Sequence, residues 1–130
     1  MAFYLDTSAA AKLVVAEPDS QAMVSWAAAH ETALIASDLL RTELFRATQR
    51  AVPDRMQRAR SVLDALTLFN LTSATFDRAA TLDPEELRSL DALHLAAALE
   101  LGDDLDGIVT YDSRMAAAAS LYGVAVITPT

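Results

Sequence analysis

Short apolar runs alternate with longer segments of helical periodicity along this chain. Five mostly apolar runs have the length expected of buried strands and are bounded by polar or turn-forming residues: 2–5, 33–36, 68–71, 108–111 and 124–127. Seven segments have helical character: 8–16, 19–29, 38–51, 54–66, 74–81, 90–101 and 113–121. Strands separated by helices are typical of βαβ units, in which helices cover both faces of a parallel sheet. The pattern therefore predicts an α/β protein with a three-layer α/β/α fold, in which a short central parallel sheet is flanked by helices.

Residues that start and stop helices stand at the segment boundaries. Asp19 and either Ser37 or Asp38 occupy positions where a side chain caps the first turn of a helix. Ser89 holds the same position before the next-to-last helix, and Gly102 follows that helix as a stop signal. We therefore expect these residues to mark helix ends.

Acidic residues stand beside predicted strands and helix starts. Asp6 directly follows the first predicted strand and Asp112 follows the fourth, while Asp91 lies in the first turn of a helix. Ligands of open parallel sheets bind at the carboxyl ends of the strands, so these acids can converge although they are far apart in sequence. Each acid also has a local explanation, because Asp6 and Asp112 can serve as helix N-caps and Asp91 can interact with the helix dipole.

A fourth acid, Glu43, shares the apolar face of its predicted helix with Leu40 and Leu44. A carboxylate on that face loses its water on folding, at a cost of about several kcal/mol unless it is paired or bound to a metal. A salt bridge to Arg41 or Arg46 is the structural alternative. The pattern predicts that Glu43 points inward.

Carboxylates that lie close together repel one another, and a hard divalent cation compensates that repulsion. One shared site explains these four positions better than four separate structural roles. We expect it to bind Mg²⁺, with Mn²⁺ as a substitute, through four acids that are both metal ligands and catalytic residues: Asp6, Glu43, Asp91 and Asp112. Such a site performs metal-assisted phosphodiester chemistry.

Hydroxyl side chains stand next to the first of these acids. Thr7 and Ser8 are placed to orient the Asp6 carboxylate or a metal-bound water. Ser8 is equally well placed to cap the first helix, and Thr110 has the same two interpretations. We take Thr7 and Ser8 as supporting residues of the site.

One histidine falls near the predicted site. His94 follows Asp91 by three residues on a helix, but the only other histidine is His30. A zinc site or a facial triad would therefore lack partners. We interpret His94 as structural and assign it no general-base role.

Composition fits one compact domain. With 130 residues and 53% hydrophobic content, the chain can bury a single well-packed core. The absence of cysteine excludes disulfide frameworks, thiolate zinc sites and cysteine nucleophiles. The first apolar run follows no basic segment and is cut by Asp6, so we expect neither a signal peptide nor a membrane span. These features favour a cytoplasmic protein.

Charge is unevenly distributed along the chain. A net charge of −8 argues against a protein that coats nucleic acid by bulk electrostatics. Six of the ten basic residues nevertheless fall within 41–60, whereas 83–112 holds nine of the eighteen acids. An arginine-rich flank beside an acidic centre can hold a phosphate backbone, although such arginines are also common on solvated helix faces. The candidates for phosphate contacts are Arg41, Arg46, Arg50 and Arg114.

Four segments carry a resemblance to a known family: FYLDTSAAAKLV at the start, SDLLRTELFRA around Glu43, SLDALHLAAAL around Asp91, and GIVTYDSRMAAAASLYGV at the end. They resemble the PIN-domain ribonucleases, and in particular the VapC toxins of bacterial toxin–antitoxin pairs. The opening Asp-Thr-Ser is weakly specific. An Asp-Ala-Leu-His-Leu-Ala segment about twenty residues before a strand ending in Thr-Tyr-Asp is strong in combination. The resemblance covers nearly the whole chain.

The resemblance implies a single PIN domain over 1–130 and the toxin component of a type II toxin–antitoxin system. It implies a metal-dependent endoribonuclease that hydrolyses structured RNA, frequently transfer RNA, with Ser8 as the small polar residue that supports the acids. It also implies a homodimer, a VapB-type antitoxin whose C-terminal segment occludes the metal pocket, and a higher toxin–antitoxin assembly formed by the two. Either Asp91 or Glu43 would align or deprotonate the attacking water.

Three other classes of protein share part of this pattern. A haloacid-dehalogenase-like phosphatase also places an aspartate after its first strand, but it usually needs a second one two positions later, where this chain has Ser8. A receiver-type signalling domain expects a lysine after a late strand, whereas the only lysine here is Lys12. A catalytically silent PIN scaffold that binds a protein partner is the remaining alternative, and an RNA-cleavage assay distinguishes it.

Overall fold

Five parallel strands form one sheet at the centre of the molecule. In the computed structural model, which describes residues 1–130, the strands lie in the order β3-β2-β1-β4-β5. Their bounds are Ala2–Leu5 for β1, Leu34–Ser37 for β2, Thr67–Phe69 for β3, Leu105–Val109 for β4 and Val126–Ile127 for β5. Every neighbouring pair is parallel. The predicted α/β fold class is confirmed.

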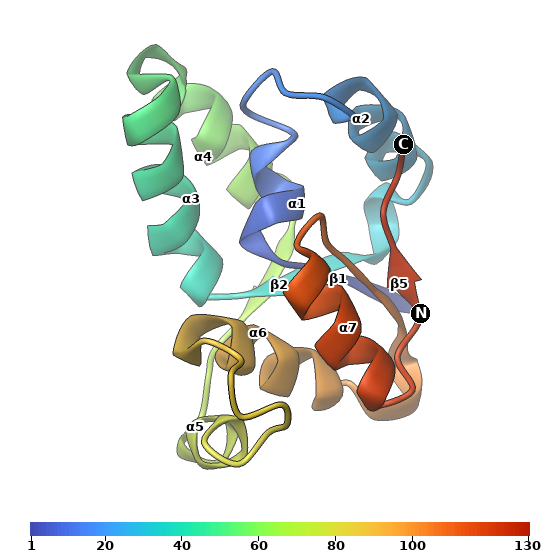
Figure 1. Ribbon diagram of the computed structural model, residues 1–130. Helices are drawn as coiled ribbons and strands as arrows, with labels where there is room; N and C mark the ends of the chain where they lie inside the picture. The colour runs from blue at the N-terminus through green and yellow to red at the C-terminus, as the bar shows by residue number, and fades with distance from the viewer.

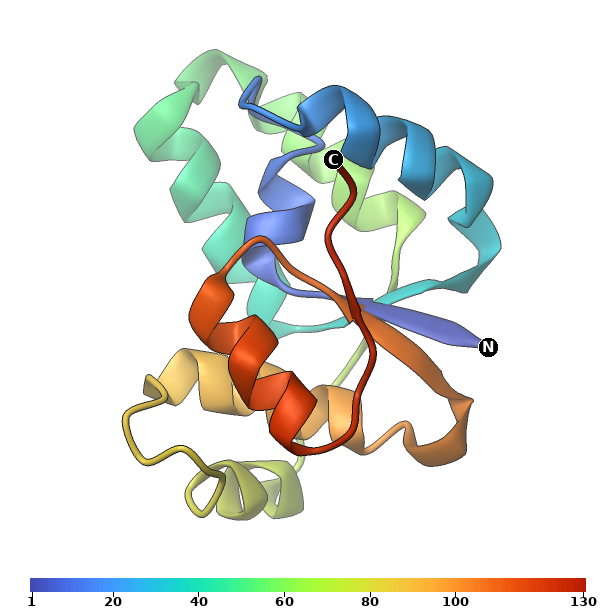
Figure 2. The same cartoon turned by 45° about the vertical axis from the view of Figure 1, so that its right-hand side comes forward.

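Helices cover both faces of the sheet. The first four lie on one face, and the last three lie on the other (Figures 1 and 2). Their bounds are Thr7–Ala11 for α1, Ser20–Ala29 for α2, Leu39–Ala51 for α3, Met56–Ala65 for α4, Ser73–Ala79 for α5, Ser89–Leu99 for α6 and Ser113–Leu121 for α7. Short 3₁₀ helices occupy Glu31–Ala33, Pro53–Arg55 and Gly102–Asp104. None of the helices combines the length and apolar character needed to cross a bilayer.

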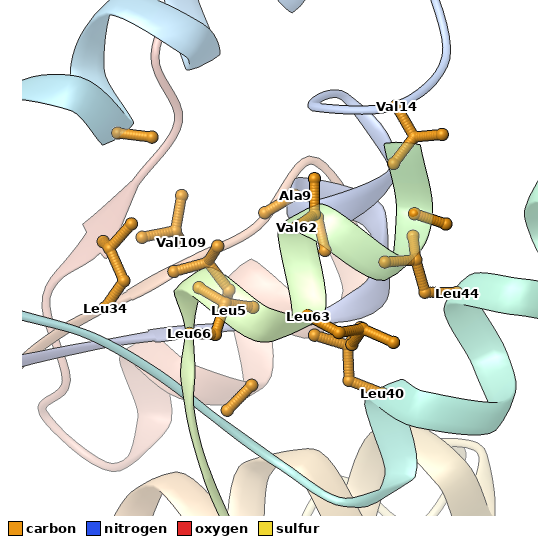
Figure 3. Packing of buried hydrophobic residues seen from close by; sticks show 14 of the residues in the cluster. Leu5, Ala9, Val14, Leu34, Leu40, Leu44, Val62, Leu63, Leu66 and Val109 are labelled. Atoms are coloured by element: carbon orange, nitrogen blue, oxygen red, sulfur yellow. The ribbon is translucent and has the colours of Figure 1, made fainter. Parts of the chain in front are cut away.

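The core is divided by the sheet into two layers, because successive side chains of a strand point to opposite faces. On β1, Leu5 joins the larger cluster under α1 to α4, while Tyr4 joins the cluster under α6 and α7. Figure 3 shows part of the larger cluster, in which the apolar sides of α3 and α4 meet through Leu40, Leu44 and Leu63. The apolar stripe that predicted α3 therefore faces the core.

Several elements are shorter than the hydrophobic pattern predicts, and three of them show the reason. Helix α1 ends at Ala11 instead of Ala16, because the chain continues in turns whose hydrogen bonds mostly span three residues rather than four. Strand β3 stops at Phe69, where its pairing with β2 ends. Strand β5 pairs with β4 only at Val126 and Ile127. Pairing partners set the strand limits, and the pattern of one segment does not reveal them.

Two of the predicted caps on the first face are wrong. Asp19 precedes α2 in a left-handed conformation, with φ of 70°, and accepts no capping hydrogen bond. Asp38 precedes α3 without capping it, because its carboxylate pairs instead with Arg41 at 2.9 Å. The Ser37 hydroxyl accepts a hydrogen bond from Tyr4, so it does not cap α3 either.

The predicted boundaries of α6 also shift. Arg88 is the N-cap residue and Ser89 is the first helical residue, and no side chain caps the helix. The helix ends at Leu99, and Gly102, with φ of 55°, opens the following 3₁₀ helix. The side chain of Arg88 extends to two of the acids described below.

Candidate active site

Asp6 lies where β1 gives way to α1, at the carboxyl edge of the sheet. Its backbone N–H donates to the carbonyl of Val109 on β4 at 3.3 Å, so the ends of β1 and β4 meet there. Asp6 is 4% exposed, and its Oδ1 accepts hydrogen bonds from Ser8 Oγ at 2.6 Å and from the N–H of Ala9 at 3.1 Å. Thr110 Oγ1 donates to Oδ2. The predicted N-cap role of Asp6 is confirmed, and Ser8 supports Asp6 instead of capping α1.

Burial dominates the electrostatics of Asp6. Loss of water raises the pKa of its carboxyl group above the ordinary value, although the donors on Ser8, Thr110 and Ala9 and the nearby His94 act in the opposite direction. In the metal-free protein these groups do not fully offset the cost of burying the ionised carboxylate, and we call Asp6 under-compensated in this sense. A nearby cation would relieve that cost.

Glu43 extends from α3 towards α1 and α6. Thr7 Oγ1 donates to Glu43 Oε1 at 2.8 Å, and His94 Nε2 contacts the same oxygen at 2.5 Å. Burial acts to raise the pKa of Glu43, but the hydrogen bond and charge of His94, helped by Thr7, outweigh it and hold the pKa below its ordinary value. The expected inward orientation is thus found. The alternative of a salt bridge to Arg41 or Arg46 is wrong, because the partner is His94.

Asp91 and Asp112 share one cation. Arg88 Nε donates to Asp91 Oδ2 at 3.2 Å, and Arg88 Nη2 approaches Asp112 Oδ2 at 3.5 Å. Asp112 also caps α7, since its Oδ1 accepts from the N–H groups of Arg114 at 2.8 Å and Met115 at 3.2 Å. The predicted N-cap role of Asp112 is confirmed. Its Oδ2 remains directed to the site.

Side-chain contacts and short stretches of the chain together connect the four acids in a ring. Asp6 and Glu43 are joined through the adjacent Thr7, and Glu43 contacts His94, one helical turn after Asp91. Arg88 then bridges Asp91 to Asp112. Thr110 connects Asp112 to Asp6, because its Oγ1 accepts from the N–H of Asp112 at 3.1 Å and donates to the Asp6 carboxylate. The structure therefore brings all four predicted acids to one edge of the sheet.

The acids surround this edge without forming a finished cage. No three histidine, aspartate or glutamate side chains lie close enough together to enclose a metal ion as they stand. The donor set nevertheless fits Mg²⁺, which prefers oxygen ligands, keeps several waters and binds through one or two carboxylates together with substrate phosphate. The under-compensated Asp6 carboxylate and the cation shared by Asp91 and Asp112 both mark a place where positive charge is favoured.

A groove of about 810 Å³ runs from this site between α3 and the α5–α6 side of the molecule. Thr7 and Glu43 are the residues of the site that line it, and the candidate phosphate contacts Arg46 and Arg50 line it as well. Its apolar lining consists of Leu39, Ala47, Leu71, Phe76 and Leu90. Arg41 and Arg114 do not line this groove, so the structure groups only two of the four predicted arginines.

Several residues of the site were missed or undervalued at the level of sequence. His94 is 2% exposed and belongs to the site, although its spacing from Asp91 already indicated a shared helix face. Tyr4 and Ser37 lie behind His94, on β1 and β2, and no local signal pointed to them. Arg88 was hidden by the mistaken cap at Ser89.

Comparison with known sequences identifies the family. The chain matches the family described as "PIN domain" over residues 3–121. It is 38% identical over 130 residues to Ribonuclease VapC47 of Mycobacterium tuberculosis, covering 97% of this chain and 96% of that protein. It is 41% identical over 128 residues to Ribonuclease VapC46 of the same organism, covering 98% of each.

Comparison with solved structures supports the same fold. Mycobacterium tuberculosis VapC20, described as a sarcin-ricin loop cleaving toxin, is similar with a TM-score of 0.74 and 16% identity, over 90% of this chain and 95% of that one. A toxin–antitoxin complex from Klebsiella pneumoniae contains a chain with a TM-score of 0.70 and 22% identity, over 100% of this chain and 98% of that one. The chain therefore belongs to the PIN-domain family and, within it, to the VapC proteins.

Proposed function

We propose that this protein is the toxin of a type II toxin–antitoxin pair and acts as a Mg²⁺-dependent endoribonuclease that hydrolyses RNA phosphodiester bonds. The observation that carries the proposal is the ring of four acids at the carboxyl edge of the sheet, with an under-compensated Asp6 at its most buried point. The names of the VapC relatives support a ribonuclease activity.

Four side chains would hold the metal: Asp6, Glu43, Asp91 and Asp112. Mg²⁺ or Mn²⁺ bound there supplies charge neutralisation at the scissile phosphate and lowers the pKa of a bound water. Ser8, Thr110 and the N-terminal turn of α1 hold Asp6 in a fixed orientation. Thr7 and His94 do the same for Glu43.

Glu43 and Asp91 are the candidates for aligning or deprotonating the attacking water. The lowered pKa of Glu43 keeps this carboxylate ionised at neutral pH, as a base or a ligand must be. Asp91 Oδ2 is held by Arg88, so this oxygen becomes available only when the guanidinium moves. In this proposal Arg88 leaves the two acids when the divalent cation enters.

The groove is the proposed path of the RNA. Arg46 and Arg50 would contact the phosphates that flank the scissile bond, which gives affinity without base specificity. Phe76, which is exposed, offers a ring on which an unpaired base can stack. A structured RNA with an unpaired loop, such as a transfer RNA, is therefore the proposed substrate class.

The proposed partners follow from the family. We propose a VapB-type antitoxin that covers the acid ring and the groove, and a homodimeric toxin. The same fold occurs in a chain that was solved as part of a toxin–antitoxin complex. Covering the groove would shield both its apolar lining and its acids.

Cleavage of total cellular RNA tests the proposed activity. Purified, antitoxin-free protein is incubated with RNA and Mg²⁺, alongside an EDTA sample and the Asp6→Asn variant. We expect discrete fragments with Mg²⁺ that disappear in both controls. Fragments that persist in EDTA would contradict metal dependence, and a folded, metal-bound protein that cleaves no RNA would favour a binding-only scaffold.

A further inference from the structure

His94 is a buried polar side chain that the reaction, as described above, uses only indirectly. Its ring spans the space between β1 and α3, with Nε2 at 2.5 Å from Glu43 Oε1 and Nδ1 at 2.7 Å from the hydroxyl of Tyr4. Tyr4 is itself fully buried, and its hydroxyl donates to Ser37 Oγ at 2.9 Å. Residues from two strands and two helices thus form one chain of hydrogen bonds that ends on Glu43.

The chemistry of the contact defines which ring nitrogen of His94 donates to Glu43. An ionised carboxylate only accepts hydrogen bonds, so Nε2 must carry the hydrogen that it shares with Glu43. Thr7 Oγ1 donates to the same oxygen at 2.8 Å. Both donors therefore engage Oε1, and Oε2 is left for a ligand.

Burial makes this arrangement rigid. His94 and Tyr4 are packed edge to face, with ring centroids 5.7 Å apart, and Phe69 packs edge to face on Tyr4 at 6.2 Å. The imidazole cannot turn away from Glu43 without breaking its bond to Tyr4 as well.

We propose that His94 is a positioning residue that holds Glu43 by Oε1 so that Oε2 faces the metal, with Tyr4 and Ser37 as its buried anchor. This inference rests on the proposed function, because it takes Glu43 as a metal ligand. Residues that orient a metal ligand in this way commonly change metal affinity about 10- to 100-fold when they are replaced.

Two amide substitutions distinguish the roles of the two ring nitrogens of His94. In His94→Gln the amide reaches the position of Nε2 and can still donate to Glu43, whereas in His94→Asn it reaches only the position of Nδ1 and can still bond to Tyr4. Mn²⁺ affinity is measured by calorimetry, and thermal unfolding in EDTA reports on the fold. His30→Gln, at the only other histidine, is the matched control.

We expect His94→Asn to weaken Mn²⁺ binding at least about tenfold, while His94→Gln and His30→Gln stay within about threefold of the wild-type protein. Equal affinities for folded His94→Asn and wild-type protein would overturn the inference and leave the proposed function intact. A wild-type protein that binds no Mn²⁺ would overturn both.

A further variant covers the case in which His94→Asn fails to fold. Tyr4→Phe keeps the imidazole and the packing of the ring but removes the anchoring hydroxyl. We expect it to weaken Mn²⁺ binding towards the lower end of the same range, about tenfold. Unchanged affinity in folded Tyr4→Phe would contradict the anchoring role and overturn the inference.

Discussion

The Asp6 carboxylate destabilises the metal-free protein, so removing its charge should stabilise the fold. Burial raises the pKa of Asp6 in the folded state despite three hydrogen-bond donors. In Asp6→Asn, the amide oxygen keeps its bonds to Ser8 and Ala9, and the amide nitrogen can donate to the hydroxyl of Thr110. The substitution changes the charge and preserves the shape.

The magnitude follows from two opposing effects. Replacing a buried ion pair by neutral residues of similar volume often stabilises a protein by about 1–4 kcal/mol, and we take this range for the neutralisation of Asp6. Removing a negative charge from the N-terminus of a helix loses about 0.3–1 kcal/mol, while asparagine caps a helix about as well as aspartate. The expected net gain therefore lies between about 0 and 4 kcal/mol, centred near 2 kcal/mol. Each kcal/mol corresponds to about 3–5 °C in Tm for a domain of this size.

The sign of the pH dependence follows from the raised pKa. Below the ordinary value of 3.8, Asp6 is protonated in the folded and unfolded states, and the variant has no charge to remove. As the pH rises through the folded-state pKa, the wild-type protein loses stability relative to Asp6→Asn. The difference is complete once the pH exceeds the folded-state pKa of Asp6.

Thermal unfolding in EDTA measures this difference, with the exposed Asp64→Asn as a control that should change the free energy of unfolding by less than about 0.5 kcal/mol. Adding Mg²⁺ at about 1,000 times its Kd should stabilise the wild-type protein by about 4.1 kcal/mol and Asp6→Asn hardly at all, so their order reverses. A lower Tm for Asp6→Asn than for wild type in EDTA at neutral pH would refute the reasoning, since the fold would then already compensate the charge.

Three further predictions concern other parts of the molecule. Arg88→Gln should tighten Mg²⁺ binding about two- to fivefold in calorimetry, because the 64% exposed Arg88 side chain bridges two of the acids and competes with the metal for them. Weaker binding would make Arg88 a supporting residue. Gly107→Ala should lower the free energy of unfolding in urea by about 1–2 kcal/mol, because the new Cβ would overlap the end of Ile127; unchanged stability would show that this side chain yields freely. Replacing Arg46 or Arg50 by Gln should lower the slope of log K against log salt for binding of single-stranded RNA, measured in EDTA, by about 0.7 each; an unchanged slope would place the RNA outside the groove.

The fold was largely accessible from the sequence because its local signals agree with its global arrangement. Buried parallel strands read as short apolar runs, and the helices between them carry apolar stripes, as α3 does through Leu40 and Leu44. Caps were less predictable. Asp38 has a suitable side chain for capping, but a neighbouring arginine competes for its carboxylate, and Asp19 precedes α2 in a left-handed conformation that makes no cap.

The acids of the site were predictable as positions, and so was the support that Ser8 gives to Asp6. The partners of Glu43 were not, because Thr7 donates to Glu43 instead of Asp6 and His94 contacts the same oxygen. Asp6 and Asp112 follow strands, and the rule that ligands meet the carboxyl edge of a parallel sheet applies to both. The bond from His94 to Glu43 joins residues that are 51 positions apart, and it depends on how α6 and α3, which cover opposite faces of the sheet, approach each other at its carboxyl edge. A lone histidine on an apolar helix does not predict such a contact, so the sequence pattern led to a merely structural role for His94.

Locating a metal ion in a crystal tests the central claim, that the four acids form one metal site, most directly. Crystals soaked in Mn²⁺ would be measured for anomalous scattering, which identifies the ion independently of activity. We predict a peak about 2–2.5 Å from carboxylate oxygens of at least two of the four acids, Asp6 among them, with the Arg88 side chain displaced. A Mn²⁺ ion bound elsewhere, or no ion at a concentration that supports RNA cleavage, would contradict the account.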